Sequence, residues 1–257
     1  MSVIPSHDIE SWHDFKRDLL PALFRTAPPE AGRFIFRGQA SADWPLQTSF
    51  DRQFSRVPPD DRGRLSEQLL EAFKSQCRDH DVPDSEEMDD VRFLALAQHN
   101  GLPTRLLDWT TSPYVAAYFA FNKAISAGAI EDRTHVAIWA LDTSSPIWSR
   151  DHGVEVVHVP ALQNSRLRSQ FGRFTLARTP HVSLEHYLDQ FADEASALTR
   201  FVLPITEAWV AIPDLELMGI NAAQLFPDIS GLAQTVLTDM ILSTVSRPDR
   251  SEVAARR

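Results

Sequence analysis

The chain has 257 residues and a formal net charge of -10 at pH 7, from 25 basic and 35 acidic residues. Its hydrophobic fraction of 43% is enough for a sizeable core, and this length fits one large domain or two small ones. The acidic balance speaks against a protein that binds nucleic acid or a membrane surface non-specifically, because such proteins are usually basic, although it leaves room for a local basic cleft.

Cysteine usage and the N-terminal residues indicate a soluble protein of a reducing compartment. Cys77 is the single cysteine, so an internal disulfide and a cysteine-rich zinc site are both excluded. The first ten residues contain neither the basic region nor the apolar segment of a signal peptide. No apolar run is long enough to span a bilayer. We therefore expect a cytoplasmic protein that does not enter a membrane.

Periodicity along the chain predicts a mixture of helices and strands. Apolar residues recur at helical spacing over residues 9–23, where Ser11 or Asp8 is a possible N-cap. Further helices are expected over residues 65–77, 91–99, 114–127, 182–192 and 231–242, and strands over residues 134–141, 154–159 and 201–203. Residues 166–175 are expected to form a turn and a strand with Gly172 at the bend. Beyond Pro204 the helical pattern is interrupted by Pro213 and Gly219. No repeat, linker or composition break divides the chain, which favours a single α+β domain with a mixed or antiparallel β core split by helices.

An early strand is predicted over residues 34–39, and it carries an arginine near its end. Side chains alternate along a strand, so Phe34 and Phe36 share one face and Arg37 lies on the other. Gly38 lets the backbone make a sharp turn or approach a ligand closely. Arg37 is expected either to pair with a carboxylate such as Asp108 or to face a cleft and bind an anion.

Residues 98–113 concentrate side chains that can bind or react. These are Gln98, His99, Thr104, Arg105, Asp108, Thr110, Thr111 and Ser112. Ser112 and Pro113 start a helix, because a hydroxyl N-cap precedes proline at the first helical position. A polar turn between two apolar elements is how binding sites are built on rigid scaffolds. The alternative is an ordinary loop in which Arg105 and Asp108 pair.

Several common functional motifs are absent from the sequence. The nine glycines are widely spread, so the chain has neither a GxGxxG nor a Walker-type loop. It also lacks a GxSxG elbow. No HExxH or close histidine pair supports a metal site, and a zinc deaminase needs a paired-cysteine motif that this chain cannot supply.

The motifs that are present resemble the FRG domain, a family named for its Phe-Arg-Gly triplet. The matching segments are Phe36-Arg37-Gly38-Gln39, Trp44-Pro45-Leu46 and residues 98–110, 112–113, 164–166, 170–175, 219–220 and 225–228. This resemblance runs from about Phe34 to Leu242, most of the chain. We therefore expect the FRG domain over residues 31–245, after an N-terminal helical segment over residues 1–30 and before a charged, flexible C-terminal tail over residues 246–257. The family was defined without a settled activity, so its name alone assigns no function.

A second resemblance is to the ADP-ribosyltransferase superfamily. Arg37, followed by glycine at the end of a core strand, is similar to the first motif of that superfamily, and residues 110–119 are similar to the second. The third motif there is a glutamate in a later strand, a place that Gln170 fills best here, with Glu155 and Glu207 as further candidates. The resemblance implies an ADP-ribosyltransferase-like fold and NAD as a substrate.

The same resemblance implies roles for individual residues. The catalytic candidates are Arg37, Ser112, Gln170 and Asp108, and the candidates for binding NAD are Arg37, Gly38, Gln39, His99, Arg105, Thr110 and Thr111. An arginine can hold the phosphates or ribose of NAD with its rigid fork, and the hydroxyl groups can shape a nicotinamide pocket. Because Gln170 can only position the ribose through hydrogen bonds, the base has to come from Asp108, His99 or the substrate.

Three functions are compatible with these residues. The first is an NAD-dependent ADP-ribosyltransferase that modifies a macromolecule, nucleic acid or protein, as a toxin or anti-phage defence effector with an inhibitory partner. Residues Arg166, Arg168 and Arg173 are a candidate basic surface for nucleic acid. The second is a non-enzymatic module that binds a nucleotide or nucleic acid, which the missing glutamate favours. The third is a hydrolase that uses His99 as a base and Asp108 to orient it.

Overall fold

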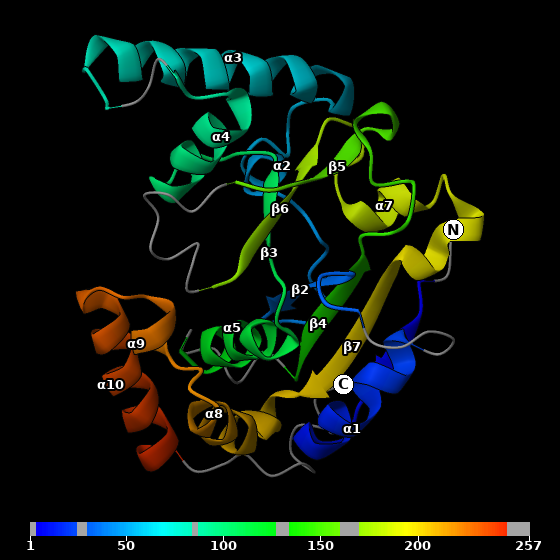
Figure 1. Cartoon of the computed structure of the whole chain (residues 1–257), viewed down its shortest axis with the longest axis vertical. Coiled ribbons are helices and arrows are strands. Elements are labelled where there is room, and N and C mark those ends of the chain that lie inside the picture. Colours follow the sequence, from blue (N-terminus) through cyan, green and yellow to red (C-terminus); the bar gives the residue numbers. More distant parts are fainter. Residues whose placement is uncertain (1–3, 25–29, 84–86, 127–133, 160–169, 246–257) are drawn as a thin grey trace.

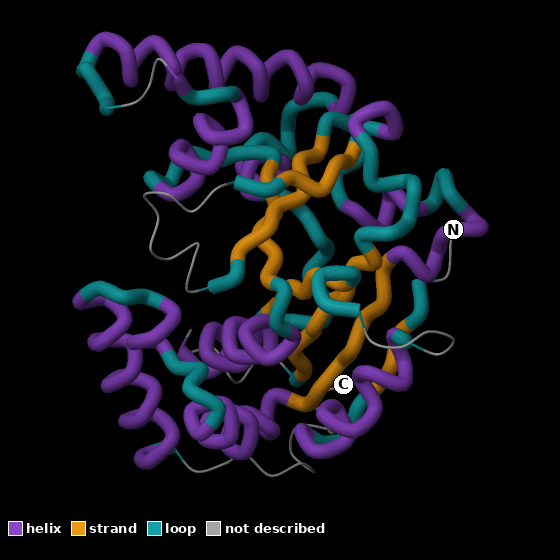
Figure 2. Tube along the Cα trace, viewed as in Figure 1, coloured by secondary structure: helices purple, strands orange, loops and turns teal. Residues whose placement is uncertain are grey.

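The core of the molecule is a mixed β-sheet between two groups of helices. The computed structural model describes residues 4–24, 30–83, 87–126, 134–159 and 170–245. Within these ranges seven strands form one sheet in the order β1-β7-β4-β2-β3-β6-β5, and Figures 1 and 2 show helices on either side of it. The pair β1–β7 is parallel and the other pairs are antiparallel. The predicted α+β class with a mixed sheet is therefore confirmed.

The strands and helices of the described ranges have the following bounds. The strands are β1 (Ser6–Asp8), β2 (Phe34–Gln39), β3 (Leu106–Thr110), β4 (His135–Asp142), β5 (Val154–Val157), β6 (Gly172–Ala177) and β7 (Leu198–Pro204). The α-helices are α1 (Trp12–Leu23), α2 (Ser49–Gln53), α3 (Pro59–Asp79), α4 (Asp90–His99), α5 (Pro113–Ser126), α7 (Leu184–Leu188), α8 (Ala208–Leu217), α9 (Ala222–Leu225) and α10 (Ile229–Thr244). Short 3-10 helices lie at η3 (Arg150–His152), η4 (Ala192–Ala197) and η5 (Ile205–Glu207).

Local chemistry sets the start of α1 as the sequence predicts. The backbone N–H of Asp14 donates to the Ser11 hydroxyl at 3.1 Å, so Ser11 is the N-cap. The apolar face of α1 includes Trp12 and Phe15, which are fully buried. The strand β1, which the sequence pattern does not predict, pairs with β7. The N-terminal elements therefore share the sheet and core of the rest of the chain, and the expected tail 246–257 lies outside the described residues.

Two faces of the sheet carry separate cores because strand side chains alternate. On β2, Phe34 and Phe36 pack into the cluster beneath α1, α5, α8 and α9, whereas Ile35 joins Trp139 and Tyr187 on the opposite face. A third cluster lies beneath α4, on the β3–β6–β5 half of the sheet. In Figure 1, α3 and α4 lie over that half, and α5, α8 and α10 lie beside the other half.

Two sequence expectations are corrected by backbone geometry. Strand β2 pairs with β4 through Gln39, so the chain makes no sharp turn at Gly38. Helix α8 continues through Pro213 and ends before Gly219, whose φ of +78° suits a residue without a side chain. Pro213 is the sixth residue of α8, beyond the first turn in which a proline costs no helix hydrogen bond, so α8 continues past it at the cost of one such bond.

Gly38 is required by helix packing. A Cβ placed on Gly38 would lie 1.9 Å from the carbonyl oxygen of Ala116 in α5. This is far inside van der Waals contact, so α5 would have to move away from β2. Gly38 thus allows the backbone of α5 to approach β2 closely.

The substitution Gly38→Ala is expected to lower the free energy of unfolding by about 1–3 kcal/mol or more, because it overpacks a filled interior. Urea unfolding followed by circular dichroism measures the change. Gly63→Ala in α3 is the matched control, since a Cβ there meets nothing within 4 Å. The control should raise stability by up to ~1 kcal/mol through helix propensity. Equal midpoints for Gly38→Ala and the wild type would contradict this account of the packing.

Candidate functional site

The candidate site lies where strands β2 and β3 separate. These strands share the single pair Phe36–Thr110, although each pairs fully with its other neighbour. Beyond that pair the Arg37 side chain reaches across the opening. Its Nη1 donates to the Asp108 carbonyl oxygen at 2.7 Å and lies 3.8 Å from the Asp108 carboxylate. Arg37 therefore joins the two strands with its side chain.

The Arg37 guanidinium has donor capacity beyond these contacts. Its side chain is 21% exposed, and its Nε makes no hydrogen bond within the described residues. Burial lowers the pKa of Arg37, Asp108 opposes this shift, and the nearby charge of Arg52 adds to it. An arginine stays protonated in spite of such shifts. A partly buried cation with spare donors is suited to binding an anion.

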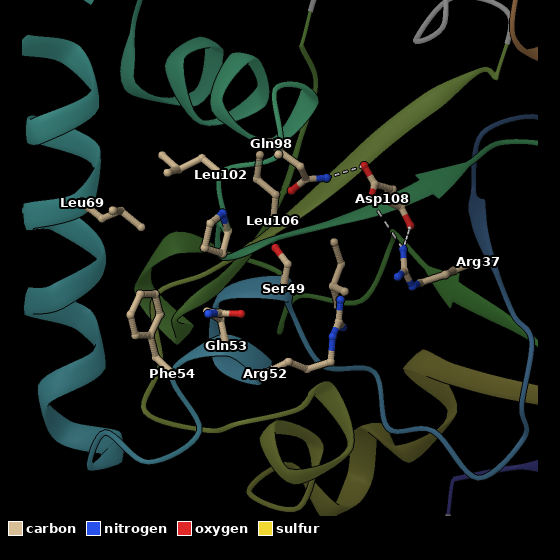
Figure 3. A pocket seen from close by; sticks show the side chains of 13 residues that line it. Arg37, Ser49, Arg52, Gln53, Phe54, Leu69, Gln98, Leu102, Leu106 and Asp108 are labelled. Carbon is tan, nitrogen blue, oxygen red and sulfur yellow. Dashed lines mark hydrogen bonds and ion pairs between the residues drawn. The ribbon is translucent and has the colours of Figure 1, made fainter. Parts of the chain in front are cut away.

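Asp108 is held by a chain of side-chain hydrogen bonds. Gln98 Nε2 donates to Asp108 Oδ1 at 2.6 Å, and the Thr104 hydroxyl donates to Gln98 Oε1 at 2.5 Å. Thr104 is buried, with 2% of its surface exposed. Figure 3 shows Gln98 and Arg37 converging on Asp108 from two sides. The carboxylate is therefore fixed in one orientation.

Opposing influences act on the pKa of the Asp108 carboxyl. Burial by the surrounding walls raises the pKa of its carboxyl, while Arg37 and the hydrogen bond from Gln98 oppose the shift without cancelling it. The side chain is nevertheless 63% exposed, because it projects into open space between those walls. A carboxylate with a raised pKa, accessible from a cleft, is suited to accepting a proton.

Two clefts meet at this pair of residues. The first, which we call the α5–α10 cleft, has a volume of about 500 Å³ and is lined by residues of β2, β3, α5 and α10 together with Gln170 and Phe226. The second, the α2–α3 cleft, has a volume of about 750 Å³ and is lined by residues of α2, α3, α4 and β3. Arg37 and Asp108 border both clefts. A ligand in either one would meet the same cation and the same carboxylate.

Part of the predicted site converges on the α5–α10 cleft. Arg37, Gly38, Asp108, Thr110 and Gln170 all line it, although Gln170 is far from the others in sequence. Gln170 Nε2 also donates to the carbonyl oxygen of Leu225 at 3.1 Å, which ties the glutamine to the chain beside Phe226.

Other predicted residues have structural partners outside the clefts. Ser112 accepts a hydrogen bond from the Val115 N–H at 3.3 Å and begins α5, as its sequence predicts. The Thr111 N–H donates to the Phe171 carbonyl oxygen. Gln39 is only 7% exposed, donates to the Pro45 carbonyl and accepts from Trp139 Nε1 at 2.7 Å. We therefore assign Gln39 to the core.

The alternative carboxylates and the predicted histidine base also lie elsewhere. Glu155 pairs with Arg178 at 3.1 Å, and Glu207 is buried and accepts from the Trp12 N–H at 2.9 Å. His99 is exposed at the end of α4 and borders neither cleft. Asp108 is thus the carboxylate that lines both clefts, among the residues described.

Arg105 belongs to a buried ion cluster and does not pair with Asp108. Its Nη2 lies 3.5 Å from Asp51 and donates to the Thr179 carbonyl oxygen at 2.6 Å. Arg62 lies 3.6 Å from the same Asp51 oxygen, and the three charged residues are almost fully buried. Burial lowers the pKa of Arg105, and Asp51 opposes that shift. The structure therefore removes Arg105 from the candidate site.

Replacing Asp51 by alanine should lower the free energy of unfolding by about 3–5 kcal/mol, because two buried arginines lose their shared counter-charge. Urea unfolding of the purified variant measures this loss. Asp61→Ala is the matched control: Asp61 pairs with Arg64 at 3.5 Å on an exposed surface of α3. The control should change stability by roughly 0–1 kcal/mol. Similar losses in both variants would refute a special role for the cluster.

Three residues that shape the clefts carry no signal in the sequence. Arg52 and Phe54 line the α2–α3 cleft, and Lys123 lines the α5–α10 cleft. Arg52 and Phe54 lie at the end of a loop-like stretch of sequence and belong to no motif. Lys123 looks like an ordinary surface residue of α5. Of the predicted basic surface, Arg166 and Arg168 lie outside the described residues, and Arg173 donates to the neighbouring Gly172 carbonyl.

Comparison with known proteins identifies one domain in the chain. The family model of the FRG domain matches residues 32–128, which confirms the FRG resemblance over the part that carries Arg37, Gln98 and Asp108. No curated protein and no solved structure matches the chain. Within the ranges described, no helix has the length and apolar character to cross a membrane, and no group of His, Cys, Asp or Glu side chains could hold a metal ion.

Proposed function

We propose that this protein is an NAD-dependent ADP-ribosyltransferase, a glycosyl-transferring enzyme that modifies a macromolecule. The observation that carries the proposal is the convergence of Arg37, Thr110 and Gln170 on the α5–α10 cleft. Arg37 and Thr110 match the first two motifs of the ADP-ribosyltransferase resemblance, and Gln170 stands at the place of the third, where the superfamily has a glutamate. The three residues come from distant parts of the sequence. The cleft volume of about 500 Å³ falls in the usual range for small-molecule sites. A role as a toxin or defence effector remains a prediction.

The chemistry of the cleft suits the parts of NAD. Arg37 and Lys123 supply positive charge for the pyrophosphate. Phe119 and Phe226 form part of the wall, with their rings edge to face at 5.9 Å, and such surfaces accommodate flat rings such as nicotinamide or adenine. Thr110 and Gln170 offer hydrogen bonds to ribose hydroxyls.

The reaction requires one bond to break and another to form. The bond between nicotinamide nitrogen and ribose C1′ breaks, and nicotinamide leaves with the electron pair. A nucleophilic oxygen or nitrogen of the acceptor then bonds to C1′, and its proton passes to Asp108. The carboxylate also stabilises the positive charge that develops on the ribose. The fixed orientation of Asp108 suits both tasks, and the raised pKa of its carboxyl suits acceptance of the proton.

One observation favours a binding module as the second candidate. The third-motif place holds Gln170, whose amide cannot accept a proton and already donates to the Leu225 carbonyl. A cleft of this kind could bind NAD or another nucleotide without turnover. The hydrolase alternative has less support, since Gln98 and not His99 donates to Asp108.

Two variants separate binding from chemistry. Arg37→Lys keeps the charge but loses the guanidinium fork, and should weaken NAD binding roughly 10- to 100-fold, as the loss of a charge-assisted hydrogen bond predicts. Asp108→Asn should leave NAD affinity within about threefold and lower transfer roughly 100-fold or more, as expected for loss of a general base. Calorimetry measures affinity, and label transfer from radioactive NAD measures turnover.

The exposed Arg64→Lys in α3 serves as the control for the arginine substitution. Binding of NAD by the wild type with neither transfer nor nicotinamide release would favour the binding module. No interaction with NAD at all would remove both NAD-based functions.

A further inference from the structure

We propose that the α2–α3 cleft receives the acceptor, and that this acceptor is single-stranded nucleic acid. The proposal rests on the proposed function in one respect, namely the transfer step. Its binding part stands on the cleft alone. The position of the cleft, its charge and its aromatic wall support this acceptor.

The position of the cleft suits the second substrate of a transfer reaction. The two clefts meet at Arg37 and Asp108. NAD in the α5–α10 cleft would therefore present its ribose next to this pair, and an acceptor in the α2–α3 cleft would approach the same carboxylate from the other side. Asp108 could then take the acceptor's proton directly. A site that holds both reactants in contact reduces the entropy cost of their encounter.

The charge of the α2–α3 cleft differs from that of the whole chain. Its charged lining residues are Arg37, Arg52 and Asp108, two cations and one anion, in a protein of net charge -10. The positive charge of Arg52 lies close enough to lower the pKa of Arg37. Arg52 is exposed at the end of α2 and also donates to the Gln47 carbonyl, which restrains it. A locally positive cleft in an acidic protein favours a phosphate backbone.

An aromatic wall distinguishes nucleic acid from an acidic peptide. Phe54 lines the cleft and is half-buried, and its ring lies 4.7 Å, centroid to centroid, from the fully buried ring of Phe50. This support holds Phe54 in place as a platform on which a base can stack. Figure 3 shows Phe54 at the end of the cleft opposite Arg37, with Arg52 and Gln53 between them. Gln53 is exposed and can bond to a base edge.

The need for stacking selects a single strand. In a duplex, the faces of each base are covered by the neighbouring bases. Proteins that recognise RNA sequence accordingly bind unpaired bases, which can stack on aromatic rings. A duplex would present only its backbone to Arg52 and leave Phe54 unused. We therefore expect an unpaired nucleotide with its phosphate at Arg52 and its base against Phe54.

The test measures binding and transfer separately on the full chain. Fluorescence anisotropy with a labelled single-stranded 20-mer, as RNA and as DNA, gives affinity without NAD. The substitutions Arg52→Gln and Phe54→Leu should each weaken binding roughly tenfold, and Arg52→Gln should also flatten the salt dependence by about 0.7 in log–log slope. Both should leave the NAD dissociation constant within about twofold. Arg56→Gln, an exposed arginine that does not line the cleft, is the matched control.

The outcomes separate this proposal from the proposed function. Oligonucleotide binding that depends on Arg52 and Phe54, together with label transfer to the strand, supports both. The same binding without any interaction with NAD supports the cleft assignment and refutes the transferase. Three results overturn the cleft assignment: no strand binding by the wild type, equal binding by all variants, or transfer to a purified protein acceptor that the two substitutions do not change.

Discussion

The hydrogen bond from the Arg37 guanidinium to the Asp108 carbonyl oxygen is the contact on which the site depends. It spans 2.7 Å at the point where β2 and β3 cease to pair. There the Arg37 side chain replaces the backbone hydrogen bonds between the two strands. The sheet therefore stays joined although β2 and β3 separate. Separation of the strands opens space on both sides of Arg37, and the two clefts use that space. The same residue therefore holds the sheet together and supplies the charge of the site.

A second set of contacts fixes the wall of the α2–α3 cleft. Helix α2 is joined to the segment before β3, because the Phe50 N–H and the Ser49 hydroxyl both donate to the Thr104 carbonyl oxygen, at 3.1 and 3.2 Å. The Thr104 hydroxyl in turn orients Gln98, and through it Asp108. The buried carboxylate of Asp51, in the same helix, holds Arg62 and Arg105. The charged cluster thus holds in place the helix that carries Arg52.

The features that sequence could predict are those decided by local chemistry. The cap at Ser11, the start of α5 at Ser112 and the alternation of Phe34 and Phe36 depend on near neighbours, and the structure confirms them. The partner of Arg105 depends on a helix that starts more than fifty residues earlier, so spacing alone suggested Asp108 wrongly. Strand β1 has three residues, too few for a periodic pattern, and exists because β7 offers it an edge.

The shared border of the clefts has a thermodynamic consequence. Arg37 has one guanidinium, which Asp108 and a ligand in either cleft must use together. A ligand that draws Arg37 toward one cleft changes the number of guanidinium donors that are left for a ligand in the other cleft. The two ligands would therefore alter each other's affinity. Such coupling is reciprocal by necessity: the factor by which the first ligand changes the second equals the factor by which the second changes the first. With the two proposed ligands, the opening between β2 and β3 would therefore couple their affinities through one guanidinium.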